Sequence, residues 1–186
     1  MNSVIETIKS RRAIRKYLPE QINDKELNTI LEAAIYAPSA HNEQSWHFTV
    51  IQNKDAIADL NKSAKEAAKE LSQDEAIKQL VFDEDVDIFY GAPTVIVVSG
   101  EEKAMMPLID CVAATENMLI AARSLTIGSC WNGIAAFLFN SNSGMEYAKK
   151  LEIPEGYKPY YAIAMGYTDS TPEAPPRRGG TVNFIK

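Results

Sequence analysis

Cationic side chains gather at the two ends of this chain. The first 18 residues carry five of them against a single acid, Glu6. The five are Lys9, Arg11, Arg12, Arg15 and Lys16. The last ten residues carry Arg177, Arg178 and Lys186 and no acid. Because a planar guanidinium donates two parallel hydrogen bonds to the oxygens of an anion, such clusters suit a phosphate or another dianion. The alternative interpretation is ordinary surface charge in contact with water.

A polar loop is predicted at residues 37–46, which read APSAHNEQSW. Pro38 ends a helical pattern, and an aromatic strand pattern follows the loop. The loop offers the hydroxyl of Ser39, the imidazole of His41 and the amides of Asn42 and Gln44. Since each amide has two donors and an acceptor, the loop could pair with the edge of a flat heterocycle. The same side chains could instead satisfy the backbone of a local turn.

A third segment, residues 128–133, reads GSCWNG and follows the most apolar helical pattern of the chain. Two glycines around Trp131 and Asn132 would let the backbone approach a ligand closely or turn tightly. Taken alone, this segment favours a simple turn.

Helical and strand patterns alternate along the chain without the regular spacing of βαβ units. Helices are expected at residues 3–10, 107–125 and 143–150, the second stopped by Gly128 and the third beginning with a cap. A further helix should begin at the capping box of residues 23–26 and end at Pro38. Residues 54–80 should form one or two more. Strands are expected at residues 46–52, 94–98 and 160–165, the second buried on both faces. The helix at 107–125 is apolar nearly all round and should run through the core. These patterns predict one α+β domain, residues 1–186, whose residues 168–186 form an extended, proline-containing arm.

Composition narrows the classes of function. The chain has 186 residues and a net charge of −6, which disfavours nucleic acid as a partner. It has only two cysteines, Cys111 and Cys130, which we expect to be buried, inert thiols. The acidic residues within 82–90 indicate a solvated loop, with a metal site as the less favoured alternative. Without a long apolar run or a signal peptide pattern, a cytoplasmic location is expected.

Taken together, the three polar segments resemble the FMN-dependent nitroreductase family. The matching stretches are residues 11–17 (RRAIRKY), the Ala-Pro-Ser-x-x-Asn-x-Gln-x-Trp pattern at 37–46, the glycines of 128–133 and the arginines near 177. The resemblance implies a central, mostly antiparallel sheet flanked by helices, in an intertwined homodimer whose C-terminal arms wrap the partner subunit. It further implies two FMN molecules at the subunit interface and NADPH or NADH as electron donor.

The resemblance also assigns roles to single residues. Arg11, Arg12, Ala13 and Arg15 would contact the phosphate, ribityl chain and pyrimidine edge of FMN. Pro38, Ser39, Asn42 and Gln44 would reach the flavin of the partner subunit. Trp131, Asn132 and Gly133 would lie beside the isoalloxazine ring. Arg177 or Arg178 would close on the phosphate, with Arg178 slightly favoured.

The implied activity is a ping-pong reduction of a nitroaromatic, a quinone, a flavin or an unsaturated carbonyl, with the cofactor carrying the chemistry. No side chain is expected to act as a catalytic group, and His41 and His47 are expected to be structural. A flavin-storing or sensing protein without turnover is the alternative, and a helical interaction module without cofactor is a weaker one. Two departures from the family pattern are expected to weaken FMN retention: Ala13 stands where a serine is common, and Ser45 stands where a proline is usual, which predicts a looser loop.

Overall fold

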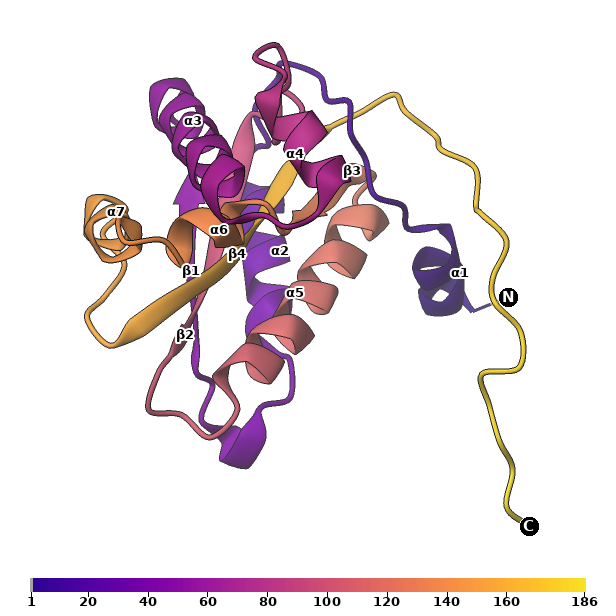
Figure 1. Ribbon diagram of the computed structural model, residues 1–186. Helices are drawn as coiled ribbons and strands as arrows, with labels where there is room; N and C mark the ends of the chain where they lie inside the picture. Colours follow the sequence, from indigo (N-terminus) through magenta and orange to yellow (C-terminus); the bar gives the residue numbers. More distant parts are fainter. Residues whose placement is uncertain (1) are drawn as a thin grey trace.

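A four-stranded antiparallel sheet lies between two layers of helices in the computed structural model, which describes residues 2–186 (Figure 1). The strands are β1 (Trp46–Ile51), β2 (Thr94–Glu101), β3 (Ile127–Asn132) and β4 (Tyr157–Tyr167), in the order β1-β2-β4-β3. All three strand pairs are antiparallel. This confirms the predicted α+β fold with a central antiparallel sheet.

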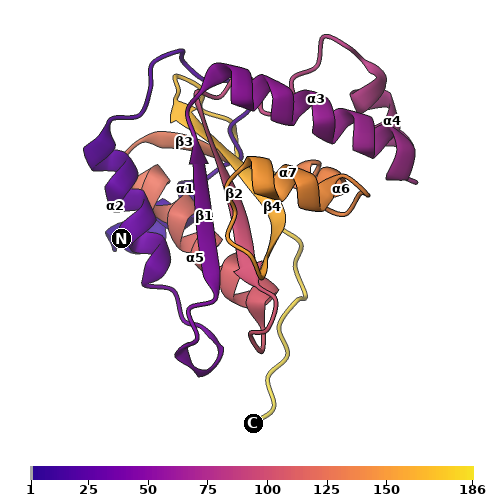
Figure 2. The same cartoon turned by 90° about the vertical axis from the view of Figure 1, so that its left-hand side faces the viewer.

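Two helical layers cover the two faces of the sheet (Figure 2). The helices are α1 (Ser3–Ser10), α2 (Asp24–Ile35), α3 (Lys54–Leu71), α4 (Glu75–Phe82), α5 (Pro107–Ser124), α6 (Ala135–Phe139) and α7 (Gly144–Lys150), with a short 3-10 helix at Ala40–Asn42. One layer is α2 packed on α5, and the other contains α3 packed on α6. Asparagine side chains cap α2 and α3, because Asn23 and Asn53 each accept a hydrogen bond from a backbone N–H of the first turn.

The central strand β2 divides the core into two apolar clusters. Val95 and Val97 pack toward α3 and α6, whereas Ile96 and Val98 pack toward α2 and α5. All four side chains are fully buried, as the continuous apolar run predicts.

Residues 127–132 correct one prediction, since they form strand β3 and not a loop or turn. Gly128 does not stop the preceding helix, which ends at Ser124. The reversal is made by Thr126, whose φ of 60° is left-handed. Gly128 instead permits close packing, because a Cβ there would lie 2.8 Å from Thr168 Cγ2 and 2.9 Å from Ile14 Cγ2.

The apolar helix α5 corrects a second prediction. Its inner side is buried, but Leu108, Ile109 and Val112 are 47%, 61% and 40% exposed. The helix therefore covers one face of the sheet and leaves an apolar face outside. The cap predicted for α7 is also absent, since Ser143 forms no side-chain cap and its N–H donates to Ser141 Oγ at 3.2 Å.

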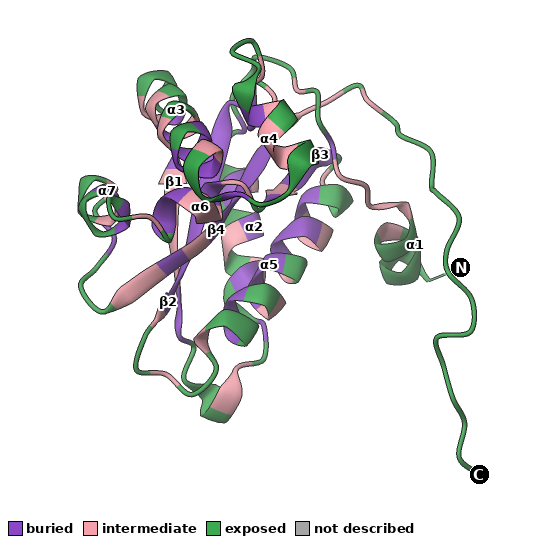
Figure 3. Ribbon diagram, in the orientation of Figure 1, coloured by how far each residue is buried: buried purple, intermediate pink, exposed green. Residues whose placement is uncertain are grey.

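Both ends of the chain lie outside the two layers, as the exposure colouring shows (Figure 3). Helix α1 has no buried residue, and the residues after Tyr167 form neither helix nor strand and are exposed almost throughout. No helix among residues 2–186 is both long and apolar enough to cross a membrane.

Three further features concern single side chains. Cys111 and Cys130 are buried and unpaired, and burial raises the pKa of both thiols, to about 12 for Cys111. The acidic loop after α4 is held by Lys65, whose ammonium donates to the carbonyls of Asp83 at 2.7 Å and Val86 at 2.8 Å. Within residues 2–186, no group of three or more metal-ligating side chains could hold a metal ion.

Substituting Gly128→Ala tests the close packing of β3. We expect the free energy of unfolding to fall by about 1–3 kcal/mol, because the new methyl group would overlap Ile14 and Thr168. Gly133→Ala is the control, since a Cβ there meets no atom within 4 Å. Equal stability of both variants in denaturant unfolding would contradict this account.

Candidate functional site

Residues 11–18 lie against β3 at the edge of the sheet, without forming a regular strand. The N–H of Ile14 donates to the carbonyl of Ser129 at 2.9 Å, and the N–H of Leu18 donates to that of Tyr167 at 2.8 Å. Ala13 forms a parallel bridge with Ser129. The arginines of this segment are therefore positioned by backbone hydrogen bonds to β3 and β4.

A pocket of about 80 Å³ opens between this segment, the end of α5 and the start of the arm. Its lining residues include three arginines, Arg11, Arg12 and Arg123, and no acidic residue. Several hydroxyl residues complete the wall: Ser10, Thr126, Ser129, Thr168, Ser170 and Thr171. This is the donor set that a phosphate would require.

The guanidinium groups retain capacity for an anion. Arg12 donates through one terminal nitrogen to the carbonyls of Lys9 and Arg11, while its Nε is buried without a hydrogen-bond partner. Arg11 Nε lies 3.7 Å from Glu116 Oε1, and both side chains are partly exposed, so this ion pair is weak. An anion in the pocket would give these groups the acceptors they lack.

Arg123 contributes to the pocket although no motif pointed to it. It lies in the last turn of α5 and donates from Nε to Ser10 Oγ at 3.0 Å. In the sequence it reads as an ordinary basic residue at a helix C-terminus, which is a common and unspecific signal.

Arg15 lies apart from the pocket, beside Tyr90 and Cys130. Its guanidinium carbon is 5.8 Å from the centre of the Tyr90 ring. A hydrogen bond with Tyr90 raises the pKa of Arg15, so the group stays charged at any physiological pH. Tyr90 itself adopts a left-handed φ of 60°, within a turn that the carboxylate of Asp87 holds together. The structure thus fixes a cation and a phenol beside the middle of β3.

The loop after Pro38 presents two amides to solvent. Ser39 organises it, because its carbonyl accepts from the N–H of Asn42 at 3.1 Å and its hydroxyl accepts from the N–H of Gln44 at 3.0 Å. Gln44 Nε2 donates to Asn42 Oδ1 at 3.2 Å, and both side chains are exposed. Ser39 therefore serves the local turn, whereas the two amides face outward.

Ser45 corrects the prediction of a looser loop. The residue is 1% exposed, and its hydroxyl donates to the carboxylate of Asp110 at 2.7 Å. The hydroxyl ties the loop to α5, a contact that a proline could not make.

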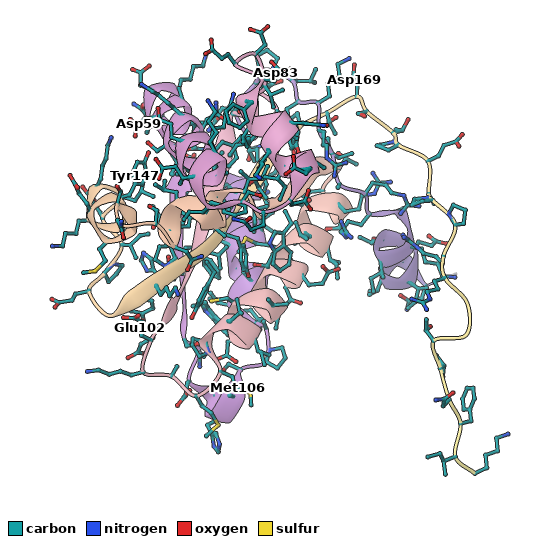
Figure 4. All side chains as sticks on the ribbon, viewed as in Figure 1. Asp59, Asp83, Glu102, Met106, Tyr147 and Asp169 are labelled. Atoms are coloured by element: carbon teal, nitrogen blue, oxygen red, sulfur yellow. The ribbon has the colours of Figure 1, made fainter. Side chains whose placement is uncertain are left out.

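The pocket and the amide loop lie at opposite ends of α5. Arg123 lines the pocket, whereas Asp110 binds the loop. Asp110 and Arg123 are 13 positions apart along the helix, which corresponds to roughly 20 Å. In Figure 4, Asp169, which lies between the pocket residues Thr168 and Ser170, and Met106, next to the Met105 that binds the loop, are labelled at opposite ends of the molecule. One chain does not bring the two predicted sets of site residues together.

The remaining predicted residues are placed differently from one another. Trp131 packs against Tyr161 with ring centres 4.4 Å apart and ring planes tilted by 38°, and Gly133 is exposed with open space around it. Asn132 is buried and already engaged, since it donates to the carbonyl of Ile88 at 2.6 Å and accepts from the N–H of Ala135 at 3.1 Å. Its side chain holds the loop of Tyr90 against β3.

Arg177 and Arg178 lie in the exposed arm and do not line the pocket. Neither His41 nor His47 lines the pocket. His41 is exposed at a left-handed φ of 50°. His47 packs against Tyr157, and burial lowers its pKa.

Comparison with known proteins gives a consistent result. The family described as "Nitroreductase family" matches residues 8–167. A protein of Archaeoglobus fulgidus, provisionally named NADH dehydrogenase/NAD(P)H nitroreductase, is 34% identical over 173 residues, which cover 90% of this chain and 86% of that protein.

Solved structures agree with this match. A nitroreductase with bound FMN from Bacteroides fragilis has a TM-score of 0.90 and 36% identity, with 100% of both chains covered. A nitroreductase with bound FMN from Desulfitobacterium hafniense has a TM-score of 0.89 and 28% identity, again with 100% of both chains covered.

The engagement of Asn132 has a testable consequence. Asn132→Ala should lower the free energy of unfolding by about 1–3 kcal/mol without any ligand, because the Ile88 carbonyl and the Ala135 N–H lose a buried partner. Asn140→Ala is the control, since its hydrogen bond to the Ala136 carbonyl is exposed, and we expect a change within about 0.5 kcal/mol. If denaturant unfolding finds no loss at position 132, the side chain is free to serve a ligand.

Proposed function

The chain belongs to the nitroreductase family, and on this premise we propose that it is an FMN-dependent oxidoreductase that takes hydride from NADH or NADPH and reduces a small acceptor. The observation that carries the proposal is the pocket with three guanidinium groups and no carboxylate on its wall. The FMN bound in the similar nitroreductase structures supports the identity of the anion as a flavin phosphate.

The residues present fit this cofactor. Arg11, Arg12 and Arg123 would hold the phosphate, because all three residues line the pocket. Five residues of strand lead from Gly128 at the pocket to the open backbone of Gly133, a span of roughly 17 Å that suits an extended mononucleotide. The ring would then lie near Trp131 and Gly133, as the resemblance implies.

FMN, when bound, supplies the capacity to accept a hydride and to pass two electrons on. The chain's own contribution is electrostatic and steric. Arg15, kept charged beside Tyr90, would favour negative charge at the pyrimidine edge. Gly133 leaves space for the donor and the acceptor to use one face in turn, a ping-pong order. The acceptor is one of the flat molecules named above, and residues 60–90 are proposed to line its face.

We also propose a homodimer, because the single chain leaves apolar surface uncovered. Val4, Ile5 and Ile8 of α1 are each more than 40% exposed, as are Leu108 and Ile109 of α5. The arm exposes three further apolar side chains, Val182, Phe184 and Ile185. A second copy would bury these surfaces and bring its own Asn42 and Gln44 to the flavin. The partner's arm is also the proposed route by which Arg177 or Arg178 reaches a phosphate.

The cytoplasmic location and the lack of a nucleic-acid partner stay predictions from composition. Ala13 has no hydroxyl where the family pattern commonly has a serine. Ser129, which forms a β-bridge with Ala13, does line the pocket.

Anaerobic reduction tests the proposed function. Protein loaded with FMN and mixed with NADH or NADPH should lose the visible absorption of oxidised flavin, and a quinone or nitroaromatic should restore it. Flavin that stays oxidised would instead indicate a storage or sensing protein, and a chain that binds no FMN would refute the proposal.

Sedimentation of the loaded sample should give the mass of a dimer, and a loaded monomer would contradict the role of the amide loop.

Arg11→Ala tests the phosphate pocket. Loss of a charged donor should weaken FMN binding by about 1.5–3 kcal/mol, roughly 10- to 150-fold. Lys149→Ala, an exposed cation on α7, removes the same charge elsewhere and should leave the affinity unchanged. Fluorescence titration with FMN measures both, and equal affinities would remove Arg11 from the site.

A further inference from the structure

The loop at residues 39–45 has a backbone that needs support. His41, Asn42 and Gln44 have φ angles of 50°, 58° and 51°, which are left-handed. None of them is glycine, and such angles cost free energy for side chains with a Cβ. The loop keeps this shape only where other contacts determine it.

Those contacts converge on one buried carboxylate. Asp110 is 2% exposed, and each of its oxygens accepts one hydrogen bond from the loop. The N–H of Ala40 donates to Oδ1 at 2.9 Å, and the hydroxyl of Ser45 donates to Oδ2 at 2.7 Å. The two donors stand on either side of the three left-handed residues, so the carboxylate fixes both ends of the strained stretch.

The buried negative charge of Asp110 depends on the hydrogen bonds that the loop donates. No Lys or Arg of residues 2–186 forms a salt bridge with it. It lies in the first turn of α5, where the helix dipole favours a negative charge. A buried carboxylate that loses its donors is strongly destabilised, so departure of the loop from α5 is penalised.

Two further hydrogen bonds hold the same loop to neighbouring segments of the same chain. Met105 N–H donates to Glu43 Oε2 at 2.8 Å, and Glu101 N–H donates to the carbonyl of Ser45 at 2.8 Å. Both are independent of Asp110 and keep the loop near β2 and α5.

We propose that Ser45 and Asp110 form a clamp that positions the exposed amides of Asn42 and Gln44 for the flavin of the second copy. Both are positioning residues, since they act through the loop and do not touch the cofactor. The proposal rests on the proposed function, because it is FMN that the amides would meet. It assigns to Ser45 the ordering role that a proline would otherwise have at that position.

The clamp is tested by FMN titration of Ser45→Ala and Asp110→Ala beside the wild-type dimer. Each variant should raise the FMN dissociation constant about tenfold, the loss of a hydrogen bond to a charged group. The double variant should bind FMN no more weakly than Asp110→Ala alone, because the two residues act as one unit. Asp110→Asn should stay within about threefold of wild type, since its amide can accept from Ala40 and donate to Ser45.

Tyr147→Phe is the matched control. It removes a hydrogen bond between Tyr147 and Asp59, which joins α7 to α3 well away from the loop (Figure 4). It should lower the thermal midpoint of unfolding while leaving the FMN dissociation constant unchanged. Sedimentation of every variant establishes that the dimer persists.

The outcomes separate the two proposals. If the wild type binds no FMN, the proposed function fails. If the wild type binds FMN and a folded, dimeric Ser45→Ala binds it equally well, the clamp is refuted. The clamp is also refuted if Tyr147→Phe loses as much affinity. Should Asp110→Ala not fold, Ser45→Ala and Asp110→Asn decide the result.

Discussion

The gathering of three arginines around one pocket is the constraint on which the candidate site depends. Arg11, Arg12 and Arg123 meet at one pocket, and no carboxylate on its wall offsets them. Glu116 approaches Arg11 only at 3.7 Å and is half exposed. An acidic chain that concentrates positive charge in this way gains most when an anion occupies the pocket. The backbone hydrogen bonds of Ile14 and Leu18 to β3 and β4 hold the segment there.

The same arrangement is the reason for proposing that two copies of the chain form the site. The anion pocket uses the C-terminal end of α5, and the amide loop uses its N-terminal end. One rigid helix keeps these two parts of the site roughly 20 Å apart. A two-fold partner can place its own loop beside the first chain's pocket, whereas no bending of α5 could do so. The exposed apolar side chains of α5, Leu108, Ile109 and Val112, lie in its first turns beside the amide loop, a surface that such a partner would cover.

Much of the fold could be predicted from periodicity, because apolar spacing directly reflects burial. The buried strand β2 and the capped helix α2 follow from local sequence alone. Strand β3 could not be predicted in this way, since its glycine, serine and asparagine match no strand pattern and its pairing partner β4 is distant in sequence. The exposed face of α5 could not be predicted either, because the sequence does not distinguish an apolar side chain in the core from one on an exposed face.

Site residues divide along the same line. The arginines of residues 11–15 are marked by their motif, but Arg123 joins them only through the packing of α5. Asn132 lies within a motif, yet its hydrogen bonds commit it to the fold. Ser45 reads as a weakened turn until Asp110, 65 residues away, is placed beside it.

The start of the arm belongs to two structures at once. Thr168, Ser170 and Pro172 line the pocket, and the same residues are the root of the segment proposed to embrace the other subunit. In the proposed dimer, FMN binding and docking of the arm on the partner subunit would therefore be thermodynamically linked. If docking of the arm strengthens anion binding by some free energy, anion binding strengthens docking of the arm by the same amount. Dilution of the protein and depletion of its flavin would then have the same effect on the quaternary structure.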